Sequence, residues 1–163
     1  MSDLRWTDIK SSTMNPDEFL QKHKSLTRNY ENYQPNPEVL EVINKIISNK
    51  NERLKILSIS ADWCPDSALN VPRMVKIVKM LNSEDLEMRI LSGVNRNYKQ
   101  TRYGDSPWQP KPPEAVDPKF NLNAVPAFYF FNKNGEYVGR IVERPRKFGT
   151  LEEEIADILK LGP

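Results

Sequence analysis

The chain has one cysteine, Cys64, and one histidine, His23, among its 163 residues. A single cysteine excludes an internal disulfide, and the pair is too small for a zinc site with four Cys and His ligands. A catalytic scheme that needs two histidines is excluded as well. We therefore expect no metal and no cofactor, and any sulfur chemistry of this chain belongs to one thiol.

Long apolar runs are also missing. No stretch approaches the ~20 apolar residues that cross a bilayer, and residues 1–10 lack the apolar segment of a secretory signal. Lys and Arg number 24 against 22 Asp and Glu, so no large basic field indicates a nucleic acid or membrane partner. We expect a soluble chain with neither partner, and a lone cysteine fits a reducing cytoplasm.

Glycine is scarce, with 6 residues, whereas 13 prolines divide the chain. Asn15 and Asn36 each stand directly before a proline, which is the pattern of a capped helix start. We expect helices over residues 16–29 and 37–49, and the second has apolar residues at helical spacing. Five prolines in the second half of residues 95–118 instead predict an irregular segment.

The middle of the chain has the pattern strand, helix, strand. Residues 54–60 form a short apolar run typical of a buried strand, and residues 86–91 alternate as a second strand. Apolar residues at helical spacing between them predict a helix, so the two strands should be parallel. Because Pro72 cannot donate to the carbonyl of Ala68, we expect this proline to interrupt the helix with a kink.

The end of the chain predicts a β-hairpin and a helix. Residues 127–131 and 137–142 flank a short polar link that contains Asn-Gly, a strong hairpin signal. Thr150 begins a capping box before a last helical pattern. A parallel pair joined to an antiparallel hairpin, with helices on both faces, is a mixed α/β sandwich.

Cys64 lies just past a predicted strand and just before a predicted helix. At that point backbone N–H groups and the helix dipole favour a negative charge, and the thiolate is the reactive form of cysteine. Pro65 suits the first helical position, whereas the charge of Asp66 opposes a neighbouring thiolate. The residues alone leave two interpretations, a reactive thiol or a small buried apolar side chain.

The turn Trp63-Cys64-Pro65-Asp66-Ser67 after a strand, Val125-Pro126 before a strand, and the closing hairpin and helix resemble the thioredoxin family. The resemblance covers residues 37–160. It implies one thioredoxin-like α/β domain over residues 1–163, with a mixed β-sheet flanked by helices. Residues 1–36 form an N-terminal extension, two extra helices precede the first strand, and residues 95–118 form a proline-rich insertion.

The same resemblance implies disulfide chemistry at Cys64. In this family the first thiolate of a Cys-X-X-Cys turn attacks a disulfide, and the second thiol resolves the mixed disulfide. Here Ser67 stands at the second catalytic position, and Ser58 stands where many thioredoxins have a buried acid. Without a resolving thiol, the reaction stops at the mixed disulfide until an external thiol releases it. Ser67 is either native or a Cys→Ser replacement, and the sequence leaves both open.

The resemblance also implies a substrate groove. The bond before Pro126 is then cis, and the backbone of Val125 pairs with an incoming peptide as an added strand. The alternative is a trans proline that begins a strand. The residues expected to bind substrate are Trp63, Pro65, Asp66, Val125 and Pro126.

Two function classes follow. The first is a thiol–disulfide oxidoreductase, monothiol as written, that acts through Cys64 on proteins or small molecules with thiols or disulfides. The second is a non-catalytic thioredoxin-fold module that binds a peptide or protein beside Trp63 and Pro126. The sequence leaves open whether the chain is an enzyme, what its physiological substrate is, and how many copies associate.

Two further features have competing interpretations. His23 suggests a Cys/His hydrolase, but nothing in the sequence places it beside Cys64, so we interpret it as a helix-surface histidine. Trp108, among the prolines, indicates either a lid or partner-binding loop, or an insertion that packs back on the core. Its basic neighbours in sequence are Lys99, Arg102 and Lys111.

Overall fold

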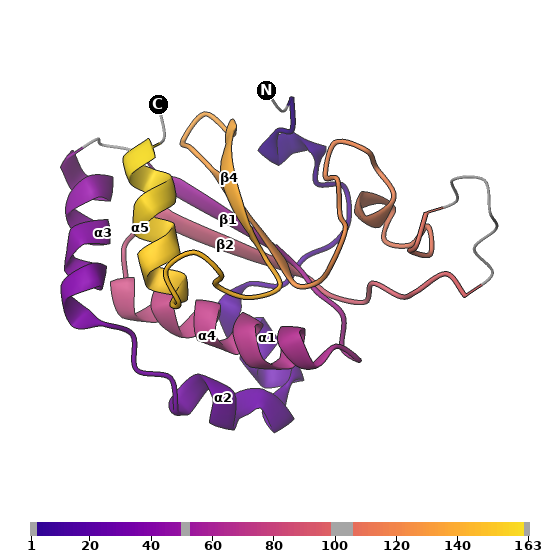
Figure 1. Cartoon of the computed structure of the whole chain (residues 1–163), viewed down its shortest axis with the longest axis horizontal. Coiled ribbons are helices and arrows are strands. Elements are labelled where there is room, and N and C mark those ends of the chain that lie inside the picture. The colour runs from indigo at the N-terminus through magenta and orange to yellow at the C-terminus, as the bar shows by residue number, and fades with distance from the viewer. Residues whose placement is uncertain (1–2, 50–52, 99–105, 162–163) are drawn as a thin grey trace.

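A four-stranded mixed β-sheet forms the centre of the molecule, in the order β2-β1-β3-β4 (Figure 1). The computed structural model describes residues 3–49, 53–98 and 106–161. β1 pairs in parallel with β2 and antiparallel with β3, and β3 pairs antiparallel with β4. The strands are β1 (Leu54–Ile59), β2 (Leu86–Leu91), β3 (Ala127–Phe131) and β4 (Tyr137–Val142). The predicted strands and the mixed α/β architecture are confirmed.

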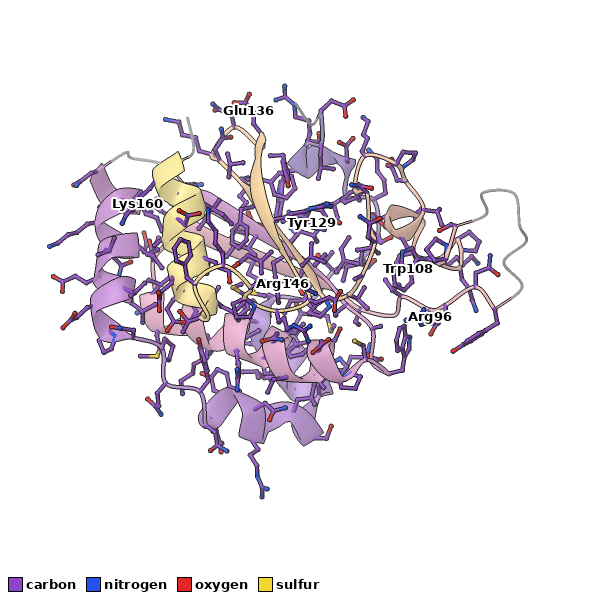
Figure 2. The ribbon with its side chains drawn as sticks, viewed as in Figure 1. Arg96, Trp108, Tyr129, Glu136, Arg146 and Lys160 are labelled. Atoms are coloured by element: carbon purple, nitrogen blue, oxygen red, sulfur yellow. The ribbon has the colours of Figure 1, made fainter. Side chains whose placement is uncertain are left out.

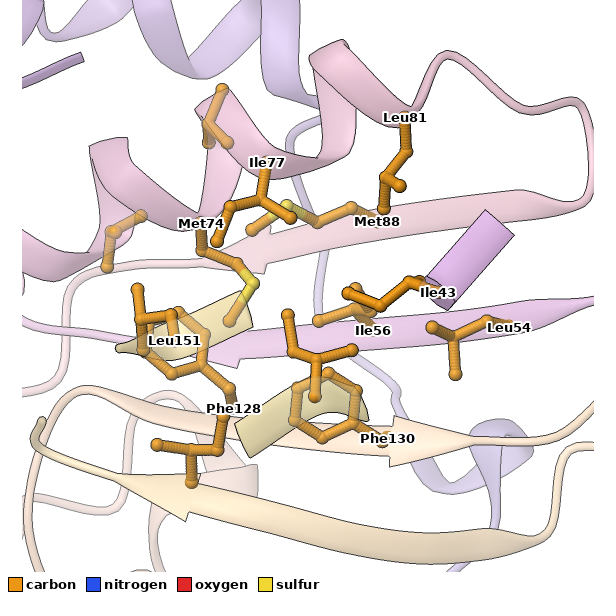
Figure 3. Close-up of a cluster of buried hydrophobic side chains, with 14 of the residues drawn as sticks. Ile43, Leu54, Ile56, Met74, Ile77, Leu81, Met88, Phe128, Phe130 and Leu151 are labelled. Atoms are coloured by element: carbon orange, nitrogen blue, oxygen red, sulfur yellow. The ribbon is translucent and has the colours of Figure 1, made fainter. Parts of the chain in front are cut away.

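The long helices cover one face of this sheet. They are α3 (Pro37–Asn49), α4 (Pro65–Leu81) and α5 (Leu151–Leu161). Successive side chains of a strand point to opposite faces, so Ile56 of β1 and Phe128 and Phe130 of β3 point toward these helices. Figure 3 shows the resulting first core, where they meet Met74 and Ile77 of α4. Each large apolar side chain buried here contributes roughly 1.5–3 kcal/mol.

The opposite face has no long helix in the described part of the chain. It is covered by Leu4, Trp6 and Ile9 of the N-terminal segment (residues 4–14, with η1, Trp6–Asp8), and by residues 106–125, with η3 (Pro113–Ala115). Leu57, Ile59, Tyr129 and Phe131 of the sheet form a second core with these segments. The expectation of helices on both faces therefore fails for the second face, because the prolines of residues 106–118 cannot donate to a helical ladder.

Of the two extra helices predicted before the first strand, the one over residues 37–49 is confirmed as α3, and the other is divided. Residues 16–29 do not form one helix: α1 (Pro16–Lys22) is followed by η2 (Lys24–Leu26) and α2 (Thr27–Glu31). Asn15 caps α1 as predicted, accepting from the backbone N–H of Glu18 at 2.8 Å. α1 ends at Lys22, because the next residue, His23, has a non-helical backbone, and the His23 ring packs on Phe19 with 4.6 Å between centroids.

α4 continues through Pro72 as one helix, so Pro72 does not end it, and the expected kink stays a prediction. The carbonyl of Ala68, which Pro72 cannot serve, accepts a hydrogen bond from the Asn29 side chain at 2.9 Å. A neighbouring helix thus supplies the donor that proline removes, and α2 lies along α4. In the described part of the chain, no helix combines the length and apolarity needed to cross a bilayer.

The N-terminal segment forms backbone hydrogen bonds with distant parts of the chain. The backbone N–H of Trp6 donates to the carbonyl of Gly135 in the β3–β4 turn at 2.9 Å, and Met14 exchanges two backbone hydrogen bonds with Ile90 of β2. Gly135 has φ +78°, and a Cβ there would lie 3.2 Å from the Cβ of Trp6. Glycine therefore suits both the turn and the close approach of Trp6.

Candidate functional site

Cys64 is the N-cap residue of α4, immediately after the turn that follows β1. Its carbonyl accepts from the N–H of Ala68 at 3.0 Å, which starts the helix. The side chain, 9% exposed, makes no hydrogen bond to the first helical turn. Instead the thiol donates to the carbonyl oxygen of Val125, with 3.4 Å between Sγ and O. The strand, turn and helix thus hold the sulfur against the loop before β3.

Hydrogen bonds from the backbone of Glu143 and from the side-chain amide of Asn70 connect that loop to the rest of the site. The Val125–Pro126 peptide bond is cis. The carbonyl of Pro126 accepts from the N–H of Glu143, just past β4, at 2.6 Å. The buried Asn70 of α4 donates its side-chain N–H to the carbonyl of Glu143 at 3.0 Å. The sequence predicted no role for Asn70, although an amide on the apolar side of a helix indicates a buried hydrogen bond.

Two tryptophans form a wall beside the sulfur. Trp63 is 44% exposed, and its indole N–H donates to the carbonyl of Val94 at 2.9 Å. Trp108 is buried, and its indole N–H donates to the carbonyl of Leu122 at 2.7 Å. The Arg96 guanidinium lies 5.3 Å from the ring centroid of Trp63 and 6.0 Å from that of Trp108. Figure 2 shows Arg96 and Trp108 beside each other past the ends of the strands.

The described part of the insertion packs back on the sheet. Trp108 belongs to the second core, and a β-bridge joins Arg96 to Trp108. Residues 99–105, which include Lys99 and Arg102, lie outside the described residues. Of the two sequence interpretations, packing on the core is confirmed for residues 106–118, while a lid or partner-binding role stays a prediction.

A cavity of about 190 Å³ brings most of the predicted site residues together. Trp63, Cys64, Asp66 and Val125 line it, and Pro126 follows Val125 directly, whereas Pro65 is not part of the lining. The other lining residues, which sequence analysis did not place in the site, are Arg96, Pro107, Trp108, Asn123, Ala124 and Glu143. They come from the insertion, the Pro126 loop and the end of β4, and their distance along the chain explains why spacing did not reveal them.

Ser67 does not line this cavity. Its hydroxyl is buried and accepts from the N–H of Ala61 at 3.3 Å. It faces a second cavity of about 200 Å³ on the other side of the turn, which His23 and Asp62 also line. Ser67 therefore stands beside Cys64 in sequence but apart from its cavity. Ser58, at the position of the family's buried acid, is fully buried, and its hydroxyl has no hydrogen-bond partner among the described residues.

His23 lies closer to the site than the sequence indicates. Its side chain is only 14% exposed, and Nε2 lies 4.0 Å from Oδ1 of Asp62 in the turn before Cys64. The interpretation of a helix-surface histidine is wrong, because α1 ends at Lys22 and the ring turns inward onto Phe19. No group of three or more His, Cys, Asp or Glu side chains in the described ranges is arranged to hold a metal ion.

Comparisons with known proteins agree with this architecture. A family model described as Thioredoxin matches residues 13–104. A search of curated proteins finds no match. An HIV epitope-scaffold structure is similar over 86% of this chain and 84% of its own, with 20% identity and a TM-score of 0.54. The thioredoxin-like fold, a mixed sheet flanked by helices and preceded by N-terminal helices, is confirmed.

Two further solved structures are similar at comparable identity. A protein of unknown function from Pseudomonas aeruginosa matches over 86% of this chain and 83% of its own, with 18% identity and a TM-score of 0.53. The thioredoxin of Fasciola hepatica matches over 74% of this chain and 91% of its own, with 20% identity and a TM-score of 0.41. Likeness at these identities concerns the fold alone.

Proposed function

This chain belongs to the thioredoxin family, and from that premise we propose that it performs thiol–disulfide exchange through Cys64 as a monothiol protein. The observation that supports this most is the placement of the sulfur. Cys64 Sγ lies 3.4 Å from the Val125 carbonyl, and the residue lines a cavity at the start of a helix. A cysteine that serves only as a small apolar side chain needs neither a cavity nor a backbone acceptor.

The proposed reaction has three exchange steps. The Cys64 thiolate attacks one sulfur of a substrate disulfide, so a new S–S bond forms and the other sulfur leaves as a thiolate that takes up a proton. An external thiol such as glutathione then attacks the mixed disulfide and releases the substrate as a thiol. A second external thiol frees Cys64, and the two external thiols leave as one disulfide. Because Ser67 cannot form a disulfide, both electrons come from the external thiols.

The backbone beside the sulfur suits an extended substrate. The Val125 segment precedes β3 and lies directly against Cys64. A peptide that adds to this segment as a strand places its own cysteine at the Cys64 sulfur. Trp63, 44% exposed, and Asp66 then contact the residues beside that cysteine. In this proposal the substrate is an extended segment with a disulfide, from a protein or a small molecule.

The test measures covalent capture by Cys64. We expect the folded chain to form a one-to-one mixed disulfide with 2,2′-dithiodipyridine, seen as a mass increase and as released thiopyridone. Added glutathione should restore the free thiol and allow repeated turnover. Cys64→Ser, which keeps the size of the side chain, should form no adduct.

The same chain unfolded in urea is the matched control for access to the thiol. If the unfolded chain reacts and the folded chain does not, Cys64 is closed to disulfides, and the proposed exchange reaction is wrong. That result would favour the second candidate, a non-catalytic module that binds a peptide beside Trp63 and Pro126. The burial of Cys64, at 9% exposure, is the observation that supports this candidate. Peptide binding unchanged by Cys64→Ser would support it further.

A further inference from the structure

Arg96 is held in a fixed position at the edge of the Cys64 cavity. Its guanidinium lies over two indole rings, 5.3 Å from the ring centroid of Trp63 and 6.0 Å from that of Trp108. Each indole is itself fixed by a hydrogen bond to a backbone carbonyl, of Val94 and Leu122. Backbone hydrogen bonds between residues 95–97 and 107–109 hold the chain at this point. The guanidinium is therefore oriented before any substrate arrives.

The donors of Arg96 are available in this arrangement. An arginine that stacks on aromatic rings uses the flat faces of its guanidinium, so the N–H groups at its edge are left for a planar anion. Arg96 is exposed and forms no ion pair with a carboxylate of the described residues. A carboxylate placed in the plane of the guanidinium can accept two N–H bonds.

The two acidic side chains of the cavity do not take this role. Glu143 is engaged by Arg146, with 3.3 Å between Nη2 and Oε1. Asp66 lies in the first turn of α4, where the positive end of the helix dipole favours its charge. Among the described residues, the cavity thus has a cation without a carboxylate partner on the insertion wall and an anion on the helix. Its charge preference then depends on which wall a substrate side chain faces.

We propose that Arg96 is a specificity-determining residue that selects disulfides from acidic peptide segments, with an Asp or Glu next to the reactive cysteine. This inference rests on the proposed exchange reaction at Cys64. When the peptide lies along Val125 with its sulfur at Cys64, the neighbouring side chain faces the wall of Trp63, Arg96 and Trp108. Its carboxylate accepts from the edge of the Arg96 guanidinium.

The experiment compares two probe peptides that differ only by Glu or Gln beside their cysteine. Each cysteine is joined to 2-thiopyridine by a disulfide, so attack by Cys64 on the peptide sulfur releases thiopyridone. We expect the second-order rate constant for the Glu peptide to exceed that for the Gln peptide by about five-fold at low ionic strength, the size expected of one exposed charge pair. Added salt should reduce this ratio.

Three variants test whether Arg96 causes the preference for the Glu peptide. Arg96→Gln should remove it and leave the Glu peptide slower than the Gln peptide, because Asp66 is then the unpaired charge of the cavity. Arg96→Lys, which keeps the charge without the planar fork, should retain a smaller preference. Arg89→Gln is the matched control, because Arg89 also stacks on a tryptophan, 4.8 Å from the ring of Trp6, but lies outside this cavity. It should leave the ratio unchanged.

Equal rates for the two peptides with the unaltered chain would overturn the inference while leaving the exchange reaction in place. So would an Arg96→Gln variant that slows both peptides by the same factor, since that is the effect of a purely structural arginine. Failure of both peptides to react, when the urea-unfolded chain reacts with both, would instead contradict the proposed function itself. The ratio of the two peptide rates therefore tests the role of Arg96, and the rates themselves test the exchange reaction at Cys64.

Discussion

The hydroxyl of Ser67 and the thiol of Cys64 lie three positions apart at the start of α4, yet they line different cavities. Cys64 is the N-cap residue of α4, and Ser67 is buried in the first turn of this helix. A disulfide between two cysteines requires Cα atoms about 4.4–6.8 Å apart and Cβ atoms about 3.5–4.5 Å apart. Serine cannot form that bond, so a cysteine at position 67 tests whether this turn can close a disulfide with Cys64.

For the residue scale, the prediction concerns Ser67→Cys. Under oxidising conditions this variant should form an internal disulfide with Cys64 and lose both free thiols. With dithiothreitol as reductant it should reduce insulin faster than the unaltered chain, because an internal thiol can now resolve the mixed disulfide. Thiol titration and an insulin turbidity assay measure the two effects.

Ser25→Cys is the matched control, because Ser25 lines the same cavity as Ser67 but belongs to η2. It adds a second thiol without the helical spacing, so both thiols should remain titratable in the folded chain. A folded Ser67→Cys protein that also keeps two free thiols after oxidation would contradict the active-site geometry described above.

Among the elements, α2 and α4 share a hydrogen bond that compensates for a proline. Pro72 leaves the carbonyl of Ala68 without its helical donor, and the amide of Asn29 supplies one at 2.9 Å. An unmade hydrogen bond at a partly buried carbonyl costs about 1–3 kcal/mol. The bond thus supports α4, which carries Cys64 at its N-cap.

A double-mutant cycle tests this compensation at the scale of the two helices. Asn29→Ala should lower the free energy of unfolding by about 1 kcal/mol in the presence of Pro72. In the Pro72→Ala background the N–H of residue 72 can serve the Ala68 carbonyl itself, so Asn29→Ala should cost less there. Urea unfolding of the four proteins gives the cycle. Equal costs in both backgrounds would show that Asn29 acts independently of the proline.

Sequence patterns located the sheet and the helices of the first core well, because period-2 and helical spacing record which side chains face a common interior. The Asn15 cap and the Asn-Gly link could also be predicted, because both depend only on neighbouring residues. The second core could not be predicted from the sequence. Leu122 and Trp108 reach the sheet from proline-rich chain without a period, so no spacing marks them as buried.

The candidate site was only partly predictable. Trp63, Cys64 and Asp66 lie within one short turn of the sequence, and the resemblance added Val125. These four cavity residues could therefore be predicted. Arg96 could not, because its position depends on the pairing of two distant stretches of the insertion. His23 was misjudged because the end of α1, rather than the helical pattern, determines where its ring points.

For the molecule as a whole, Glu114 joins the N-terminal segment to the insertion. Its buried carboxylate accepts from the backbone N–H groups of Lys10 and Ser11, at 2.6 and 2.9 Å, and from the Ser11 hydroxyl at 2.6 Å. Burial alone raises the pKa of the Glu114 carboxyl, but the hydrogen bonds from Ser11 and Lys10 outweigh it and hold the pKa below its usual 4.5. Such a group stabilises the fold above its unfolded pKa, and this stabilisation is lost as the pH falls through its folded pKa.

Glu114→Gln should therefore destabilise the chain by about 1–3 kcal/mol at pH 7, because charge-assisted hydrogen bonds are lost. The difference between the two proteins should shrink at about pH 3, which is below the usual pKa of 4.5 of the carboxyl, because the unfolded chain then binds a proton more readily than the folded chain does. Urea unfolding at both pH values measures it. Glu136→Gln is the control, because Glu136 is an exposed partner of Arg5 at 3.9 Å and should change stability by less than about 0.5 kcal/mol. A Glu114→Gln effect that is the same at both pH values would contradict this account.

The N-terminal segment also has a consequence for biosynthesis. Trp6 is hydrogen-bonded to Gly135, and Lys10 and Ser11 are hydrogen-bonded to Glu114. Because these partners lie more than a hundred residues later in the chain, the ribosome synthesises the segment long before it synthesises them. The second core can close only after the β3–β4 turn has emerged, late in translation. Until then Trp6 and its neighbours remain uncovered, and a chain that stalls before Gly135 keeps them uncovered. Such exposed apolar surface is what chaperones and proteases recognise.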